Sequence, residues 1–90
     1  MNTTKEIFHA ALLKIMDANR TRFGLQAPVL ALHLRALAVG ATPDEIVQAL
    51  EYFGSRPAPL VEETRPEIDR ENRAWKITAE GIRYVDQHGL

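Results

Sequence analysis

The chain has 90 residues, a length that suits one domain built around one hydrophobic core. Hydrophobic residues make up 46% of it and charged residues 26%, which argues against intrinsic disorder, and the absence of cysteine excludes disulfides and cysteine zinc sites. The net charge of −1 provides no overall basic field for nonspecific binding to nucleic acid. No apolar run approaches the ~20 residues of a membrane span, and we expect a cytoplasmic protein without a membrane partner.

The first predicted element is a helix over residues 3–20. Thr3 and Glu6 have the spacing of a capping box at its start. Apolar residues three and four positions apart form a core-facing stripe of Phe8, Ala11, Leu12, Ile15 and Met16. A second apolar face consists of Ile7, Ala10 and Leu13. This second face favours either burial between two packed layers or a homodimer formed through the N-terminal helix.

A short strand and a second helix are expected next. Gly24 interrupts the helical pattern, and residues 25–26 suit a very short strand. Pro28 is well placed in the first turn of a helix over residues 28–39, because its missing N–H would be unpaired there anyway. The inward residues of this helix are expected to be Leu30, Leu34 and Leu37. We expect Gly40 to end the helix by adopting a positive φ.

The strongest local signal is the sequence Thr-Pro-Asp-Glu at residues 42–45. Thr42 is predicted to be the N-cap, Pro43 the first helical residue and Glu45 the second member of a capping box. A third helix should then continue to about residue 53. Its core-facing residues are expected to be Ile46, Leu50 and Phe53, and Gly54 should end it.

Two strands and a last helix complete the predicted order. Pro57 and Pro59 exclude a further helix, so residues 60–63 favour a strand, with a charged turn over 64–72. A second strand is predicted over 73–78, with Trp75 and Ile77 on its buried side. The last helix is expected over 79–88, capped by Thr78, with Ile82 and Val85 inward and Gly89 after its end.

This order of elements resembles the winged helix-turn-helix superfamily. The match lies in residues 34–42, in Ile46 and Leu50, and in the closing strand and turn over 75–81. A further pattern looks like the wing of MarR-type regulators and consists of Asp69, Arg70, Arg73, Ala74, Ile77, Thr78 and Gly81. The chain is too short to hold the long terminal helices with which MarR-type proteins dimerise. The resemblance therefore implies a single winged-helix domain over residues 1–90, mainly α with a small antiparallel β wing (α+β), and does not imply a MarR regulator.

The resemblance also implies a regulatory protein that binds double-stranded DNA. In such folds the third helix enters the major groove, and the wing lies at the minor groove or the backbone. The residues that would then contact DNA are Thr42, Asp44, Glu45, Gln48, Tyr52, Arg70, Arg73 and Arg35. In this interpretation Gln48 would read adenine, and Thr42 would position a phosphate at the helix N-terminus.

The charge of the same segment favours an alternative. Residues 42–71 hold 8 acidic and 3 basic residues, which gives −5 on the stretch that should meet DNA. DNA affinity depends largely on neutralising phosphates, so this excess of acid opposes it. The alternative is a winged helix that binds a protein through an acidic face composed of Asp44, Glu45, Glu51, Tyr52, Glu62 and Glu63.

Nothing in the sequence indicates catalysis. The three histidines, His9, His33 and His88, are not spaced as metal ligands on one helix, and the chain has no glycine-rich phosphate loop. Ser55 is the only serine and follows a predicted helix end, where a turn role fits better than that of a nucleophile. We therefore expect no catalytic residues, no cofactor and no metal.

Overall fold

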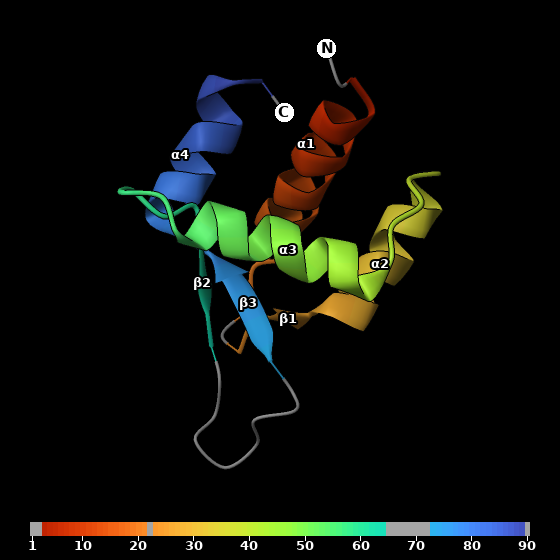
Figure 1. Ribbon diagram of the computed structural model, residues 1–90. Coiled ribbons are helices and arrows are strands. Elements are labelled where there is room, and N and C mark those ends of the chain that lie inside the picture. The colour runs from red at the N-terminus through yellow and green to blue at the C-terminus, as the bar shows by residue number, and fades with distance from the viewer. Residues whose placement is uncertain (1–2, 22, 65–72, 90) are drawn as a thin grey trace.

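The computed structural model describes residues 3–21, 23–64 and 73–89. In these ranges the protein is a mixed α+β structure with four helices and one antiparallel sheet of three strands, and this confirms the mixed class that the sequence predicts (Figure 1). The elements in chain order are α1 (Thr3–Ala18), β1 (Leu25–Gln26), α2 (Ala27–Ala36), α3 (Pro43–Gly54), β2 (Val61–Glu63), β3 (Ala74–Ile77) and α4 (Ala79–Gln87).

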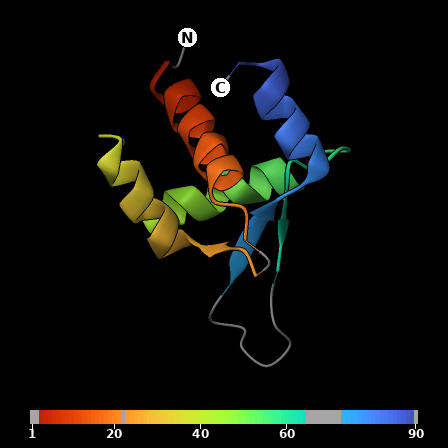
Figure 2. The same ribbon diagram turned by 180° about the vertical axis from the view of Figure 1, so that it is seen from behind.

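Strand β3 is the centre of the sheet, which has the order β1-β3-β2. Trp75 lies opposite Leu25 on β1 and opposite Glu63 on β2, so the connection after α1 is tied to the β2–β3 pair. Helix α3 crosses the middle of the molecule, with α1 and α4 on one side of it and the sheet on the other (Figures 1 and 2). Helix α3 packs against α2 and β2, and α1 packs against α2, α4 and β3.

The core joins all four helices to the sheet. Its fully buried side chains are Leu12, Leu13, Met16, Leu30, Leu34, Ile46, Leu50 and Val61. Trp75 and Val85 are also buried, as predicted, while Ile77 and Ile82 are half-buried. Ala74 is buried as well, although the alternation of side chains along a strand places it on the opposite face of β3 from Trp75.

Local capping signals predicted the helix starts well. The hydroxyl of Thr42 accepts from the backbone N–H of Glu45 at 3.2 Å, and the Glu45 carboxylate accepts from the Thr42 N–H at 3.1 Å, which confirms the capping box. Thr78 caps α4 by accepting from the N–H of Gly81 at 3.0 Å, and Gly89 follows α4 with a φ of 65°. Thr3 is the first residue of α1, and its predicted capping side chain lies outside the described part.

The end of α2 differs from the prediction. The helix ends at Ala36 rather than near residue 39, and Leu37, expected in the core, is 54% exposed. The N–H of Val39 bonds to the carbonyl of Leu34 at 2.9 Å and that of Ala38 to the carbonyl of Arg35 at 2.9 Å, the two bonds of a Schellman motif. The residue with positive φ is therefore Ala38, at 60°, and not Gly40.

We expect Ala38→Gly to stabilise the protein. Alanine in the left-handed region pays a steric penalty that glycine avoids, so the free energy of unfolding should rise by about 0.5–1 kcal/mol. Urea denaturation followed by circular dichroism measures this. Ala36→Gly, in the exposed last turn of α2, is the matched control and should lower stability, because glycine is a poor helix former there. Equal losses for the two variants would contradict the assigned conformation of Ala38.

Helix α1 ends at Ala18, two residues before its predicted end, and packs against α2, α4 and β3. Its second apolar face is mostly internal, since Leu13 is 1% exposed and Ala10 is half-buried. Leu13 is thus not available for the predicted homodimer contact, and only Ile7 of the three is largely exposed. The described ranges also contain no helix with the length and apolarity needed to cross a membrane.

Candidate functional site: the exposed side of α3

Helix α3 presents polar side chains on the side opposite its core contacts. It buries Ile46, Ala49, Leu50 and Phe53 and exposes Asp44, Glu45, Gln48, Glu51 and Tyr52. Tyr52 is 59% exposed, as the sequence predicts for a possible interface residue. The exposed residues are those predicted to contact either DNA or a protein, so the candidate site starts from this helix.

The exposed residues of α3 border two different grooves. The first, here called the α1–α3 groove, has a volume of about 480 Å³ and includes Glu45, Gln48 and Tyr52 in its lining. The second, called the α3–hairpin groove, has a volume of about 670 Å³ and includes Glu51 together with Glu62 and Glu63. The predicted acidic face is therefore divided between the two grooves, except for Asp44, which lines neither.

Arg73 pairs with two carboxylates that line the α3–hairpin groove. It donates to Glu63 through Nη2 at 2.8 Å and through Nε at 3.2 Å, and Nη2 also donates to Glu51 at 3.2 Å. Its guanidinium lies 4.9 Å from the centre of the Trp75 ring. The hydrogen bond that Arg73 donates to Glu63 is the largest of the effects that raise the pKa of Arg73. Arg73, the residue before β3, thus connects β2 and α3 through its Nε and Nη2 donors.

Two further ion pairs lie in the described residues of the strands and α4. Lys76 lies 3.2 Å from Glu62, and Arg83 on α4 lies 2.6 Å from Glu80. Each such exposed pair contributes little stability, about 0–1 kcal/mol, but it reduces the local charge. On α3, in contrast, Asp44 and Glu45 form no ion pair with any described residue. The uncompensated acid of the site is therefore concentrated in the first turn of α3.

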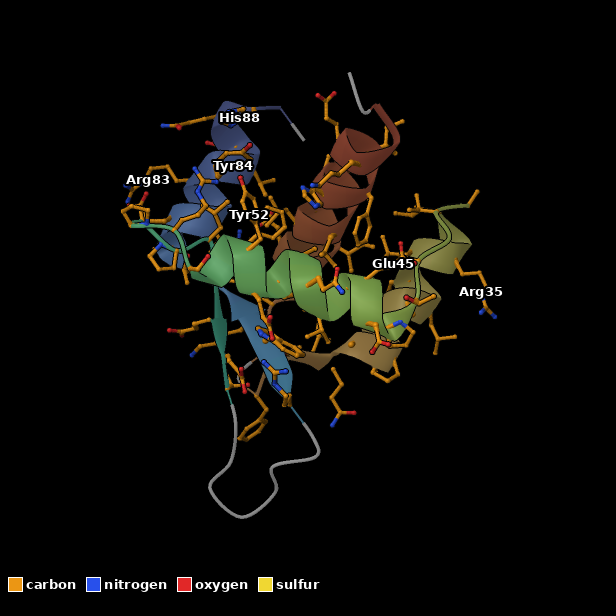
Figure 3. All side chains as sticks on the ribbon, in the orientation of Figure 1. Arg35, Glu45, Tyr52, Arg83, Tyr84 and His88 are labelled. Carbon is orange, nitrogen blue, oxygen red and sulfur yellow. The ribbon has the colours of Figure 1, made fainter. Side chains whose placement is uncertain are left out.

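The remaining residues predicted for DNA do not gather around α3. Arg35 is exposed near the end of α2 and points outward, away from the sheet (Figure 3). The hydroxyl of Thr42 is engaged in the capping box. Arg70, predicted on the wing, lies outside the described residues. Of the two described arginines that were predicted to contact DNA, Arg73 is thus paired within the protein and Arg35 points away from the sheet.

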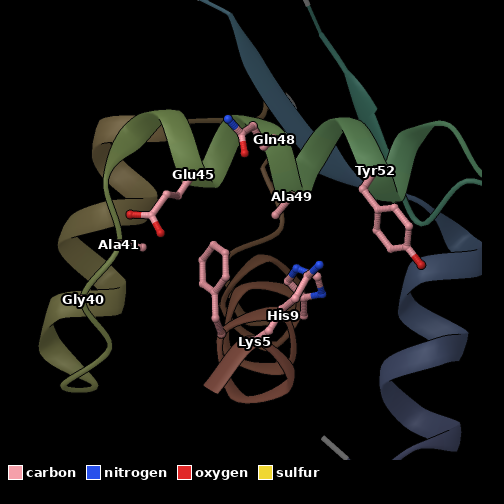
Figure 4. Close-up of a pocket in the computed structure, with 9 residues that line it drawn as sticks. Lys5, His9, Gly40, Ala41, Glu45, Gln48, Ala49 and Tyr52 are labelled. Carbon is pink, nitrogen blue, oxygen red and sulfur yellow. The ribbon is translucent and has the colours of Figure 1, made fainter. Parts of the chain in front are cut away.

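The α1–α3 groove contains residues that the sequence analysis did not select. Lys5 and His9 of α1 lie across it from Glu45 and Tyr52 (Figure 4), and Phe8 of α1 also lines it. The spacing of the three α1 residues, three and four positions apart, was a usable signal because it places them on one face of a helix. The sequence could not show that this face lies opposite α3.

His9 joins an aromatic cluster at this groove. Its ring centre lies 6.0 Å from that of Tyr52 with 23° between the planes, and 5.0 Å from that of Phe53 in an edge-to-face arrangement. Burial lowers the pKa of His9, and the charge of Lys5 lowers it further. The imidazole is therefore mainly neutral near pH 7 and acts as an aromatic wall rather than a cation.

Comparisons of the chain with family models, with curated proteins and with solved structures give no match. Within the described residues, no group of three or more histidine, aspartate or glutamate side chains is arranged to hold a metal ion.

Proposed function

We propose that the chain is a non-catalytic winged helix-turn-helix module that binds a protein partner through the exposed side of α3. Three features support the winged-helix assignment. Helix α2 packs on α3 across the turn over residues 37–42, β1 pairs with β3, and the β2–β3 pair is placed where such a fold has its wing. The combination matches the resemblance found in the sequence, including the capped start of α3.

The distribution of charge favours a protein partner over duplex DNA. Arg73, the described arginine predicted to contact DNA from the wing, is paired with Glu51 and Glu63. Asp44 and Glu45 leave the first turn of α3 acidic, at the point that would approach the DNA backbone. Because affinity for DNA depends on phosphate neutralisation, this arrangement opposes duplex binding and suits a basic protein surface.

Duplex DNA remains the second candidate because of Gln48. This side chain is exposed near the middle of α3, and the amide of glutamine can form two hydrogen bonds with adenine in the major groove. A duplex-binding protein would show affinity that falls steeply with salt, and Arg73→Ala would weaken it further.

Two binding experiments test the proposal. In the first, fluorescence anisotropy with labelled random-sequence duplexes should show no salt-sensitive binding by the wild-type chain. Salt-sensitive binding that Arg73→Ala weakens would favour the DNA candidate and contradict the proposal.

In the second, a displayed random-peptide library is selected on the immobilised wild-type chain. The enriched peptides should be basic, and their affinity should fall about three- to tenfold for the double variant Asp44→Asn/Glu45→Gln. Glutamine at 45 preserves the capping box, so this variant removes charge and retains the helix start. Asp86→Asn is the matched control and should bind as the wild type does, because this exposed carboxylate of α4 lines neither groove.

A further inference from the structure

The groove between α1 and α3 has the size of a binding site. Its volume of about 480 Å³ lies within the range of ~300–1,000 Å³ that is typical of pockets for organic ligands. Helix α1 forms one wall, α3 forms the other, and Gly40 and Ala41 of the preceding turn close one end (Figure 4). One large side chain of a partner can therefore be accommodated there.

Aromatic rings line the groove. Phe8 and His9 lie on the α1 wall with 5.5 Å between their ring centres, and Tyr52 lies on the α3 wall, nearly parallel to His9. Tyr52 is 59% exposed although it belongs to this cluster, so much of its ring is accessible to an incoming group. Aromatic pairs gain energy beyond their buried area, and aromatic residues dominate the energetics of protein interfaces.

The charges at the groove indicate which charged residue a partner would carry next to the side chain that enters it. Glu45 lines the α3 wall and Asp44 is next to it, and neither has an ion pair among the described residues. Lys5 is the cation of the α1 wall and already has an interaction of its own. An incoming segment is therefore attracted to the start of α3 by a positive charge.

We propose that the α1–α3 groove receives an aromatic side chain of a partner protein, with an arginine or lysine of the same segment placed against Asp44 and Glu45. The inference rests on the proposed function and specifies its partner as a basic segment with an aromatic anchor. A second copy of this chain is the competing occupant, and the experiment separates the two.

Gly40 offers a way to fill the groove without disturbing the core. A Cβ atom at this position meets no atom within 4 Å, and Gly40 has no positive φ that a larger residue would strain. Gly40→Trp therefore adds a bulky side chain at the end of the groove without a clash at Cβ, while Gly40→Ala is the matched control that adds only a methyl group. Thermal unfolding followed by circular dichroism checks that both variants fold.

The test uses the peptides selected on the wild-type chain. Gly40→Trp and Tyr52→Ala should each weaken their binding by about tenfold or more, Gly40→Ala should leave it nearly unchanged, and the peptides should share an aromatic residue near an arginine or lysine. Unchanged binding to both Gly40→Trp and Tyr52→Ala would overturn the groove as the anchor site. The proposed function would still stand if the Asp44→Asn/Glu45→Gln variant lost affinity for the same peptides.

Two further outcomes are decisive. The selected peptides could bind equally well to the wild type, to Gly40→Trp, to Tyr52→Ala and to Asp44→Asn/Glu45→Gln. This result would overturn the proposed function together with the inference. Light scattering tests the second copy: a wild-type dimer that Gly40→Trp converts to a monomer would assign the groove to self-association and overturn the partner proposed here. A wild-type monomer supports the proposal.

Discussion

Gly81→Ala is expected to lower the free energy of unfolding by about 3 kcal/mol or more. A Cβ atom at this position would overlap the backbone carbonyl oxygen of Leu60 and would lie 2.6 Å from Cγ1 of Ile77. The carbonyl of Leu60 cannot move away easily, because it accepts from the N–H of Thr78 at 3.0 Å. The added methyl group would therefore push the first turn of α4 away from β2 and β3.

Urea denaturation followed by the fluorescence of Trp75, the one tryptophan in the chain, measures the loss. Gly54→Ala is the matched control, because its Cβ would meet the carbonyl oxygen of Val61 at 3.5 Å, an ordinary contact distance. This control should change stability by less than about 1 kcal/mol. Similar stability of the two variants would contradict the close approach of α4 to β2.

The elements that the sequence predicted well are those determined by near neighbours. The capping box of Thr42 and Glu45 connects residues three positions apart, and the start of α3 was predicted correctly from it. The end of α2 was predicted wrongly. Glycine is the usual residue with positive φ after a helix, so the sequence favoured a turn at Gly40, whereas the chain turns at Ala38. Because the chain turns at Ala38 and not at Gly40, Leu37 lies beyond the end of α2 and outside the core.

The candidate site depended on contacts between distant residues. Arg73 meets Glu63 and Glu51, which are 10 and 22 positions away, so its neutralisation could not be derived from local spacing. The same reason applies to the α1–α3 groove, where His9 approaches Tyr52 across the fold. The sequence predicted which side chains α3 exposes, and the tertiary structure was needed to divide them between two grooves.

Trp75→Ala should cause a comparable loss, about 3–5 kcal/mol, because it removes a large buried side chain and leaves a cavity. Trp75 is 3% exposed and lies on the central strand, opposite Leu25 of β1 and Glu63 of β2. Both outer strands pair only with β3, so a cavity at this position weakens the sheet on both sides. Arg73 also loses the ring under its guanidinium, which loosens its connection to Glu51 on α3.

Circular dichroism must follow this unfolding, since the variant has no tryptophan left to report it. Trp75→Phe keeps an aromatic ring in the core and should lose clearly less stability than Trp75→Ala. Tyr52→Ala is the second control: it removes an aromatic ring that is 59% exposed, so its cost should stay below about 1 kcal/mol. If Trp75→Ala proved as mild as Tyr52→Ala, Trp75 could not be the buried centre on which β1, β2 and α3 pack, and the geometry of both grooves would have to be revised.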